Sequence, residues 1–289
     1  MRDGRRAPVT VLVYHPAHAA RYAALVDAPR GRVRVRVARS AEEAASAIAD
    51  AQVLYAWDVP ARLYARAARL RWLQVMGAGV DAALVPELPP DVTVTRAPGV
   101  FGAWMAEYVL GWCAWVTQRM ATYLEAQRAR RWAADVLPDR LRGRTLTIVG
   151  LGDIGRTIAR AARGLGMRVL GVSRTGADAR EADRVYRPRD LRRALAAADF
   201  VALTLPLTAP TRGLIGAREL AAMRPTAALV NCARGGLVDE QALASSLREG
   251  RLAGAGLDVF EQEPPPVDHP LLQLNGVIVS PHIAGATED

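Results

Sequence analysis

The sequence predicts an α/β protein made of two doubly wound domains, each built on a parallel sheet. Along its 289 residues, short β-branched runs alternate with alanine-rich stretches of helical length. This alternation is typical of a parallel sheet covered by helices on both faces. The length suggests about two domains, and the 51% hydrophobic and 23% charged residues are ordinary for a globular protein.

The first third of the chain contains the runs that we expect to be strands, at residues 9–14, 32–37, 52–55 and 72–75. A helix is expected over residues 16–26. In "RVRVRV" the alternation has period two, which predicts an edge strand with its arginines in water and three valines on a buried face, namely Val33, Val35 and Val37. Ser40 and Glu43 form a capping box for the helix that follows.

A long helical pattern joins the two halves. Residues 92–100 are expected to be extended, with a turn at Pro98 and Gly99, and one helix is expected from about 103 to 131. We interpret its aromatic side chains as core or interface packing rather than as a cofactor site; they are Trp104, Tyr108, Trp112 and Trp115. Such a helix suits a domain junction or a subunit interface.

The second half continues the alternation. Strands are expected at residues 145–149, 168–172, 200–204, 227–230, 253–257 and 277–279, and helices at 153–164, 188–197, 216–223 and 239–249. We therefore predict a substrate domain over residues 1–97 and a dinucleotide-binding domain over 98–280. A return of residues 281–289 toward the first domain is left open. The cleft between the two domains is the expected site.

Composition argues against several classes of protein. The net charge is +9, but all 38 basic residues are arginines spread along the chain among acids, so no nucleic-acid partner is predicted. Cys113 and Cys232 are too few for a disulfide framework. The apolar stretch 106–116 contains Glu107 and is too short to span a bilayer. No secretory signal or metal site is expected, and a cytoplasmic protein is predicted.

The stretch "GLGDIG" contains Gly150, Gly152 and Gly155 in a G-x-G-x-x-G pattern. It follows an apolar strand and opens an amphipathic helix, which is the context of a dinucleotide site. The three glycines permit a tight turn, a close approach of the pyrophosphate, and close packing of helix on strand. The first helical turn, with Asp153 and Ile154, offers backbone N–H groups to the anion.

An acidic residue that selects NAD is expected about 20 residues after the glycines. Ser173 and Arg174 stand there instead, and neither Val172 nor Thr175 is acidic. A carboxylate would repel a ribose 2′-phosphate, whereas an arginine pairs with it and a serine donates a hydrogen bond to it. The sequence therefore predicts NADP(H) in preference to NAD(H).

Three later stretches place polar side chains just after predicted strands. Arg234, Glu263 and His282 should all lie at the carboxyl end of one sheet, where ligands bind in open α/β folds. An arginine, a carboxylate and a histidine facing a nicotinamide are sufficient for hydride transfer to a 2-oxo acid.

At this point the sequence resembles the D-isomer-specific 2-hydroxyacid dehydrogenases, over essentially the whole chain from Val9. The motifs that carry the resemblance are "MGAGVD" (76–81), "GLGDIG" (150–155), "LPLT" (205–208), "NCARGG" (231–236), "LDVFEQEP" (257–264) and "SPHIAG" (280–285). The sequence looks most like the glyoxylate/hydroxypyruvate reductases, whose members often carry a similar Ser-Arg pair. The resemblance implies a flavodoxin-like substrate domain and a Rossmann nucleotide domain.

The resemblance also implies roles for individual residues. His282 would protonate the carbonyl oxygen as hydride arrives at C2. Glu263, rather than Glu261, would hold the imidazole and keep it protonated near neutral pH. Arg234 would grip the carboxylate or carbonyl of the substrate. The backbone N–H groups expected to cradle the carboxylate are those of Ala78, Gly79 and Val80.

Further positions match residues near the cofactor or the substrate. Asp258 matches a position near the nicotinamide and its ribose. The other cofactor-lining positions are Thr204, Pro206, Cys232, Ala233 and Gly285, and the candidates to line the substrate pocket are Tyr55, Trp57, Met76 and Phe101. In the reductase branch a tryptophan that follows this long helix reaches the substrate pocket of a dimer partner, and Trp132 matches its rough position. We nevertheless favour ordinary packing for Trp132. A homodimer through the nucleotide domain is expected.

Two other functions share this scaffold. Some relatives oxidise phosphite or formate, and some resemble nucleotide-sensing corepressors. Family members usually continue beyond the histidine with a helix that returns to the first domain, whereas this chain stops at Asp289. Without that helix, we expect looser packing of the first domain and slower domain closure.

Overall fold

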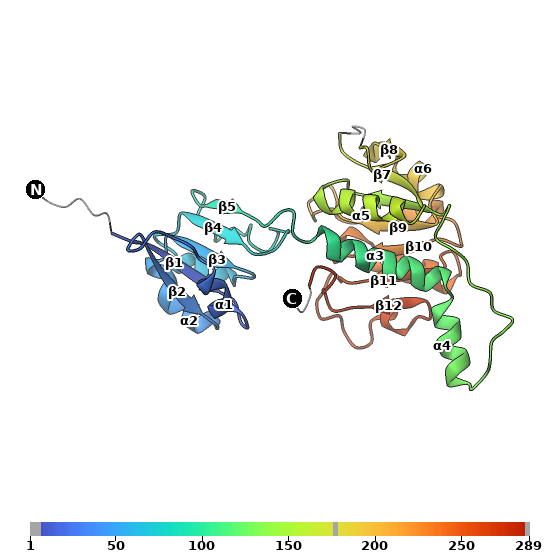
Figure 1. Cartoon of the computed structure of the whole chain (residues 1–289), viewed down its shortest axis with the longest axis horizontal. Helices are drawn as coiled ribbons and strands as arrows, with labels where there is room; N and C mark the ends of the chain where they lie inside the picture. The colour runs from blue at the N-terminus through green and yellow to red at the C-terminus, as the bar shows by residue number, and fades with distance from the viewer. Residues whose placement is uncertain (1–6, 176–178, 287–289) are drawn as a thin grey trace, which may run out of the picture. The chain divides into compact units, whose positions relative to one another are not determined.

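The computed structural model describes residues 7–175 and 179–286. The chain divides into two compact units, Met1–Val100 and Phe101–Asp289 (Figure 1). Each unit contains its own sheet, and all the strand pairs are parallel. The α/β class predicted from the alternating pattern is thereby confirmed.

The first unit has five strands in the order β2-β1-β3-β4-β5. Their bounds are β1 (Val9–Tyr14), β2 (Val33–Ala38), β3 (Val53–Ala56), β4 (Trp72–Val75) and β5 (Thr93–Thr95). This is the order of flavodoxin-like folds. Helices α1 (Ala19–Ala24) and α2 (Ala41–Ala47) and two short 3₁₀ turns connect the strands. Leu12, Leu54 and Leu73 are fully buried in the core of this unit.

Helix α1 begins later than the predicted residue 16. The ring Nδ1 of His15 accepts hydrogen bonds from the backbone N–H groups of Ala17 (3.1 Å) and His18 (3.0 Å). These bonds close a turn that delays the start of the helix. The capping box before α2 forms in part: Ser40 accepts from the N–H of Glu43, but the Glu43 carboxylate accepts from Arg39 rather than from Ser40.

Strand β2 lies at the edge of the first sheet, as its alternating sequence predicted. The prediction of a buried valine face is wrong, however, because Val35 is 37% exposed and Val37 is 41% exposed. The short helix α1 packs with Val33 but does not extend far enough to cover the other two valines. An edge strand therefore keeps its alternation here without full burial of one face.

The second unit has seven strands in the order β12-β11-β10-β9-β6-β7-β8. Their bounds are β6 (Thr145–Val149), β7 (Arg168–Val172), β8 (Arg184–Tyr186), β9 (Phe200–Leu203), β10 (Ala228–Asn231), β11 (Gly254–Leu257) and β12 (Val277–Val279). Counted from β6, this is the 3-2-1-4-5-6 order of a Rossmann sheet with one more strand added. Strand β8 was not predicted, because it is short and half-exposed.

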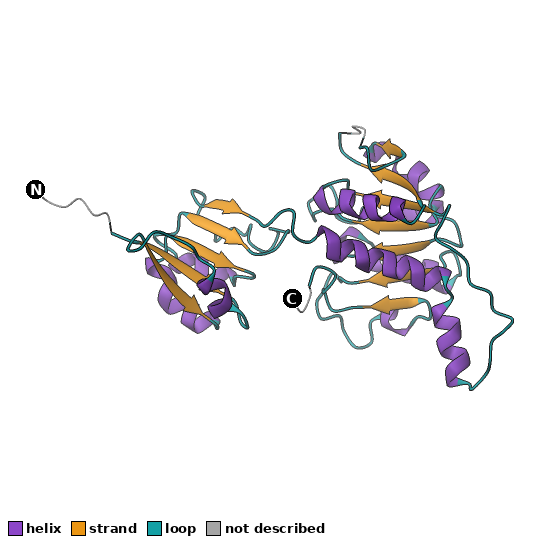
Figure 2. Ribbon diagram, viewed as in Figure 1, coloured by secondary structure: helices purple, strands orange, loops and turns teal. Residues whose placement is uncertain are grey.

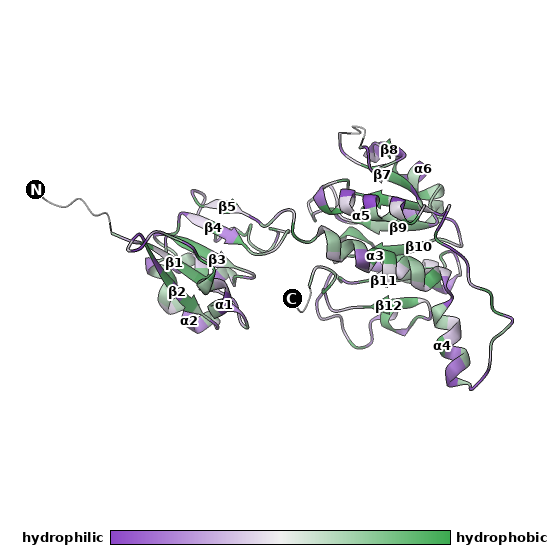
Figure 3. Cartoon of the chain, in the orientation of Figure 1, coloured by the Kyte–Doolittle hydropathy of each residue, from purple (hydrophilic) through white to green (hydrophobic). Residues whose placement is uncertain are grey.

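Helices cover both faces of this sheet (Figure 2). They are α3 (Gly102–Thr117), α4 (Met120–Arg128), α5 (Asp153–Gly164), α6 (Leu191–Ala196), α7 (Ala217–Ala222) and α8 (Glu240–Arg248). Helices α3 and α5 lie side by side. The central strand β6 is buried along its whole length, and the hydropathy colouring shows mainly apolar residues on the strands and on α3, with polar residues on α5 (Figure 3).

The prediction of one helix over residues 103–131 is wrong, because the helix is interrupted between the end of α3 and the start of α4. Arg119 has a left-handed backbone, with φ of 55°. The carbonyl of Thr117 accepts from the N–H of Asp139 (2.7 Å), and the Gln118 side chain donates to the Asp139 carbonyl (2.8 Å). The hydrogen-bonding groups at the end of α3 thus find their partner in Asp139, which lies beyond α4 in the sequence.

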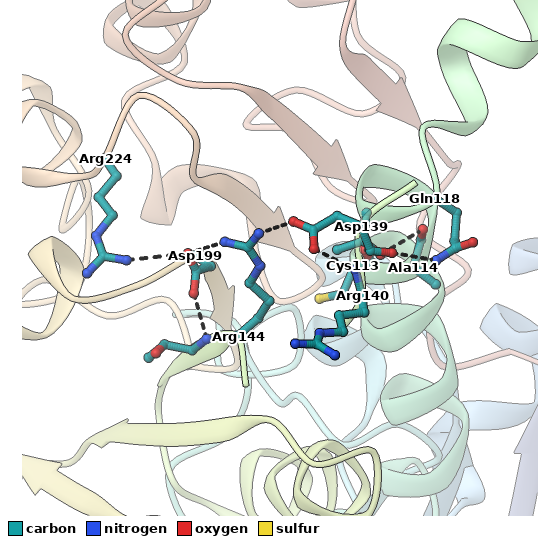
Figure 4. A network of polar contacts seen from close by, with 10 residues as sticks. Cys113, Ala114, Gln118, Asp139, Arg140, Arg144, Asp199 and Arg224 are labelled. Carbon is teal, nitrogen blue, oxygen red and sulfur yellow. Dashed lines mark hydrogen bonds and ion pairs between the residues drawn. The ribbon is translucent and has the colours of Figure 1, made fainter. Parts of the chain in front are cut away.

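A network of ion pairs and hydrogen bonds anchors Asp139 (Figure 4). Asp199 accepts from Arg224 (3.3 Å), from Arg144 (3.5 Å) and from the backbone N–H of Thr145 (2.7 Å). Arg144 also pairs with Asp139. Because these residues precede strands β6, β9 and β10, the network holds the amino end of the sheet, which is the end opposite to the predicted site.

The aromatic side chains of α3 pack against one another, which confirms their interpretation as packing. The rings of Tyr108 and Trp112 are 5.9 Å apart, and those of Trp112 and Trp115 are 6.3 Å apart. Trp112 lies against Gly256 of β11, where a Cβ atom would come within 2.9 Å of the indole. In contrast, the packing interpretation of Trp132 is wrong, because its side chain is 92% exposed.

Within the described part of the chain, the helices are all too short or too polar to cross a bilayer.

Candidate active site

The glycine turn has the geometry that its sequence predicted. Gly150 ends β6 with φ of +111°, a conformation that favours glycine. A Cβ atom on Gly155 would collide with the carbonyl oxygen of Gly150, so the helix approaches the strand as closely as the backbone allows. A Cβ on Gly152 would meet nothing within 4 Å, which leaves the backbone open to a ligand on that side.

The start of α5 can hold an anion. Gly152 is the N-cap, and no side chain caps the helix, so the first turn of α5, which includes Asp153 and Ile154, presents backbone N–H groups that suit a phosphate. The Thr204 hydroxyl, at the end of β9, donates to the Gly150 carbonyl at 2.6 Å. Thr204 therefore braces the turn in addition to its expected place beside a cofactor. These residues fit a dinucleotide pyrophosphate.

Ser173 and Arg174 follow directly after β7, the strand next to β6. The N–H of Ser173 donates to the Tyr186 carbonyl at 3.0 Å, and its hydroxyl lies 3.2 Å from that of Thr175. Arg174 is exposed, and among the described residues no acid pairs with it. The guanidinium thus carries its charge at the strand end where the ribose of a dinucleotide lies in this fold.

Glu263 and His282 form a hydrogen-bonded pair. The Nδ1 atom of His282 lies 2.8 Å from Glu263 Oε2, and Glu263 Oε1 accepts from the N–H of Phe260 at 3.0 Å. A carboxylate acceptor places the proton on Nδ1 and leaves Nε2 to face outward. The neighbouring acid Glu261 instead pairs with Arg212 at 2.8 Å. The structure therefore brings Glu263, and not Glu261, to the histidine.

The loop that carries His282 is folded around Asp258. This aspartate is only 2% exposed, and its carboxylate accepts from the Ser280 hydroxyl (2.6 Å) and from the N–H groups of Ile283 and Ala284 (2.8 Å each). The N–H of His282 donates to the Asp258 carbonyl at 2.8 Å, and His282 has a left-handed φ of 55°. Asp258 thus fixes the backbone from which the imidazole projects.

A hydroxyl relay supports Asp258 from helix α3. The Tyr108 hydroxyl lies 2.7 Å from the Ser280 hydroxyl. Since Ser280 donates its proton to Asp258, Tyr108 donates to Ser280. Burial raises the pKa of Tyr108 to about 12, so the phenol keeps its proton across the physiological range. Neither residue was assigned a role from the sequence: Tyr108 stands among apolar residues of α3, and Ser280 only opens the "SPHIAG" motif that carries His282.

Arg234 emerges from a turn built by Asn231. The buried Asn231 amide donates to the Arg234 carbonyl (2.9 Å) and accepts from the N–H of Ala233 (3.2 Å). A Cβ on Gly235 would collide with the backbone of Phe260, so the turn packs directly against the segment that leads to Glu263. Arg234 is half-buried. A polar residue closing an apolar strand was the signal that could have revealed Asn231.

The three polar side chains follow three neighbouring strands. Arg234 follows β10, Glu263 follows β11 and His282 follows β12. Of the remaining positions that the sequence predicts to line a cofactor, Pro206 is exposed, Ala233 is buried, and Gly285 lies where a Cβ would be 3.2 Å from Phe101. Burial raises the pKa of the Cys232 thiol to about 12, so it is no nucleophile near neutral pH.

The predicted carboxylate cradle lies in the first unit, where Ala78, Gly79 and Val80 follow β4. Trp57 and Asp58, after β3, line a small pocket together with Gly79. Of the four candidates for the substrate pocket, Trp57 is 50% exposed, whereas Tyr55 is half-buried and Met76 and Phe101 are buried. Across the described residues, no group of three or more acids, histidines and cysteines could hold a metal ion.

A Rossmann sheet with this glycine turn and these polar strand ends defines a nicotinamide-nucleotide-linked oxidoreductase. Residues 111–284 match the model of the D-isomer specific 2-hydroxyacid dehydrogenase, NAD binding domain. A glyoxylate reductase of Korarchaeum cryptofilum is 37% identical over 237 residues, which are 80% of this chain and 71% of that protein. The chain belongs to the D-isomer specific 2-hydroxyacid dehydrogenase family.

Solved structures agree with this assignment. A D-isomer specific 2-hydroxyacid dehydrogenase family protein from Aeromonas salmonicida is 36% identical, with a TM-score of 0.88 over 97% of this chain and 90% of that one. An NADPH-dependent glyoxylate/hydroxypyruvate reductase from Sinorhizobium meliloti, in complex with NADP and sulfate, is 27% identical with a TM-score of 0.86. That match covers 96% of this chain and 89% of the reductase. Among its relatives, the chain resembles the glyoxylate/hydroxypyruvate reductase branch.

Proposed function

We propose that this protein uses NADP(H) to reduce a small 2-oxo acid, such as glyoxylate or hydroxypyruvate, to the 2-hydroxy acid, which is the D isomer wherever the product is chiral. The observation that carries the proposal is the 2.8 Å bond between His282 and Glu263, formed on the sheet that also carries the nucleotide turn. The names of similar proteins support it, since they include glyoxylate reductases and an NADPH-dependent glyoxylate/hydroxypyruvate reductase.

The residues of the chain supply the acid and the substrate contacts. A hydride reaches the carbonyl carbon from the nicotinamide when the cofactor is bound. His282 gives a proton from Nε2 to the carbonyl oxygen, and the Glu263 carboxylate on Nδ1 stabilises the charged imidazole before that transfer. Arg234 binds the substrate carboxylate with its guanidinium fork. Hydride and proton together convert the carbonyl into the hydroxyl of the product.

The preference for NADP(H) rests on Arg174 and on the absence of an acid among residues 172–175. An exposed guanidinium without an acidic partner in the described chain suits the 2′-phosphate dianion. The two cysteines are free thiols, which agrees with a reducing cytoplasmic setting. We further infer a homodimer formed through the second unit, for which exposed apolar side chains near α4 provide the surface.

The test is a steady-state assay of the purified protein with NADPH and NADH in parallel, against glyoxylate, hydroxypyruvate and bulkier 2-oxo acids. Oxidation of NADPH by glyoxylate or hydroxypyruvate is expected. His282→Gln should lower kcat by roughly 10²–10⁴-fold, as expected for loss of a general acid, while NADPH still binds. Full activity of that variant would contradict the assignment.

A second arm separates the alternatives. Tight binding of NADPH without turnover of any 2-oxo acid would favour a nucleotide-sensing protein. Reduction of NADP by phosphite, without activity on 2-oxo acids, would instead favour phosphite oxidation on the same scaffold.

A further inference from the structure

The loop that follows β4 is held from one side by the segment that follows β5. The carbonyl of Gly77 accepts from the N–H of Ala97 at 3.1 Å. The carbonyl of the next residue, Ala78, accepts from the Arg96 guanidinium, also at 3.1 Å. Two successive carbonyls of the loop therefore point toward residues 96 and 97.

Because the peptide bond is planar, the directions of these two carbonyls also fix the directions of the N–H groups that follow them. In a trans peptide the N–H points opposite to the carbonyl of the preceding residue. The N–H groups of Ala78 and Gly79 therefore both point away from Arg96. Within the described chain, no acceptor takes the N–H of Ala78, Gly79 or Val80. Successive N–H groups that point to one side form a concavity that binds anions.

The positive charge of Arg96 also favours the binding of an anion at this loop. Asp58 lines the same small pocket as Gly79, and Asp81 follows the loop in the sequence, so this part of the chain carries negative charge that the Arg96 guanidinium counters. Arg96 is exposed, and its only partner in the described chain is the Ala78 carbonyl. A hydrogen bond to that carbonyl also polarises the peptide and strengthens its N–H as a donor.

We propose that Arg96 is a positioning residue for substrate binding, which acts by fixing the Ala78–Gly79 peptide so that its N–H faces the substrate carboxylate. The inference rests on the proposed reduction of a 2-oxo acid, because it names the group that prepares the carboxylate cradle. Arg96 does not contact the reacting carbonyl in this role. It affects the binding of the carboxylate, and the chemical step only through that binding.

The test compares Arg96→Gln with Arg69→Gln, a matched loss of one exposed arginine at the opposite, amino end of β4. A charge-assisted hydrogen bond at an exposed site should be worth about tenfold in affinity. We expect Arg96→Gln to raise KM for glyoxylate about tenfold while kcat changes about twofold or less and the Kd of NADPH stays unchanged. Arg96→Lys, which keeps the charge and a donor, should recover part of the loss.

Direct binding separates this inference from the proposed function. Oxamate carries the same carboxylate and cannot be reduced, so its affinity for the NADPH complex is measured by calorimetry in each variant. If the wild-type protein reduces no 2-oxo acid, the function fails, yet weaker oxamate binding in Arg96→Gln still supports the cradle. An equal effect of Arg69→Gln, or a fall in kcat with KM and oxamate affinity unchanged, would overturn the inference.

Discussion

At the scale of single residues, we expect Arg174 to decide which nucleotide the second unit prefers. The expected acid is replaced by Ser173 and Arg174 directly after β7. A missing carboxylate removes a contact with a ribose hydroxyl and the repulsion of a 2′-phosphate, but it adds no attraction of its own. A guanidinium without an acidic partner among the described residues adds an attraction that a 2′-phosphate alone can use.

We expect Arg174→Ala to weaken NADPH binding about tenfold or more and NADH binding less than about twofold, because a charge-assisted bond to phosphate is lost. Ser173→Asp should move the preference toward NADH, since the new carboxylate repels the phosphate and can accept from the ribose. Fluorescence titration of both nucleotides checks this, with Arg218→Ala as the control on an exposed arginine of α7. Equal losses for NADPH and NADH would sink the prediction.

At the scale of elements, the turn before α1 depends on a neutral histidine. His15 Nδ1 accepts two backbone N–H groups, and a protonated ring could not accept either. Burial, and next the nearby His18, lower the pKa of His15 below its ordinary value of about 6.5. The folded state therefore favours the neutral ring. This stabilisation is present above pH 6.5 and is lost as the pH falls through the lowered pKa.

His15→Asn should remove this acid sensitivity, because an amide oxygen accepts N–H groups without titrating near pH 6. We expect the Tm of the wild-type protein to fall more than that of the variant between pH 7 and pH 5, by roughly 1–2 °C. His18→Asn, which leaves the Nδ1 acceptor in place, should keep most of the wild-type slope. If the Tm of the wild-type protein and that of His15→Asn fell equally between pH 7 and pH 5, the mechanism would be ruled out.

Elements were predictable where their determinants are local. The bounds of β6, α5 and β7 are those expected from the sequence, because the glycines, the apolar strand and the helix pattern all lie within one short stretch. The break after α3 was not predictable, since the residue that satisfies its end, Asp139, lies far along the chain. Likewise, Arg234, Glu263 and His282 follow strand ends as expected, whereas the support from Tyr108 depends on tertiary packing.

At the scale of the whole molecule, an arm that exposes large apolar side chains projects from the second unit. Figure 1 shows α4 and the segment after it leaving the body of that unit. Trp132 is 92% exposed and Leu137 is 78% exposed. Two contacts hold the arm together: the Tyr123 hydroxyl donates to the Val136 carbonyl at 2.8 Å, and Asp139 pairs with Arg144 at its base. Large apolar side chains exposed in this way are typical of an interface between subunits.

We therefore expect a dimer in solution, with a mass about twice the 31.1 kDa of one chain. The double variant Trp132→Asp, Leu137→Asp should shift the protein to monomers at micromolar concentration, because charges would be buried unpaired in the interface. Light scattering coupled to size-exclusion chromatography measures the mass, and circular dichroism verifies the fold. Val267→Asp changes an equally exposed apolar residue outside the arm and should leave the dimer intact. A double variant that remains dimeric would place the interface elsewhere, since the arm would then be exposed in the assembled molecule as well.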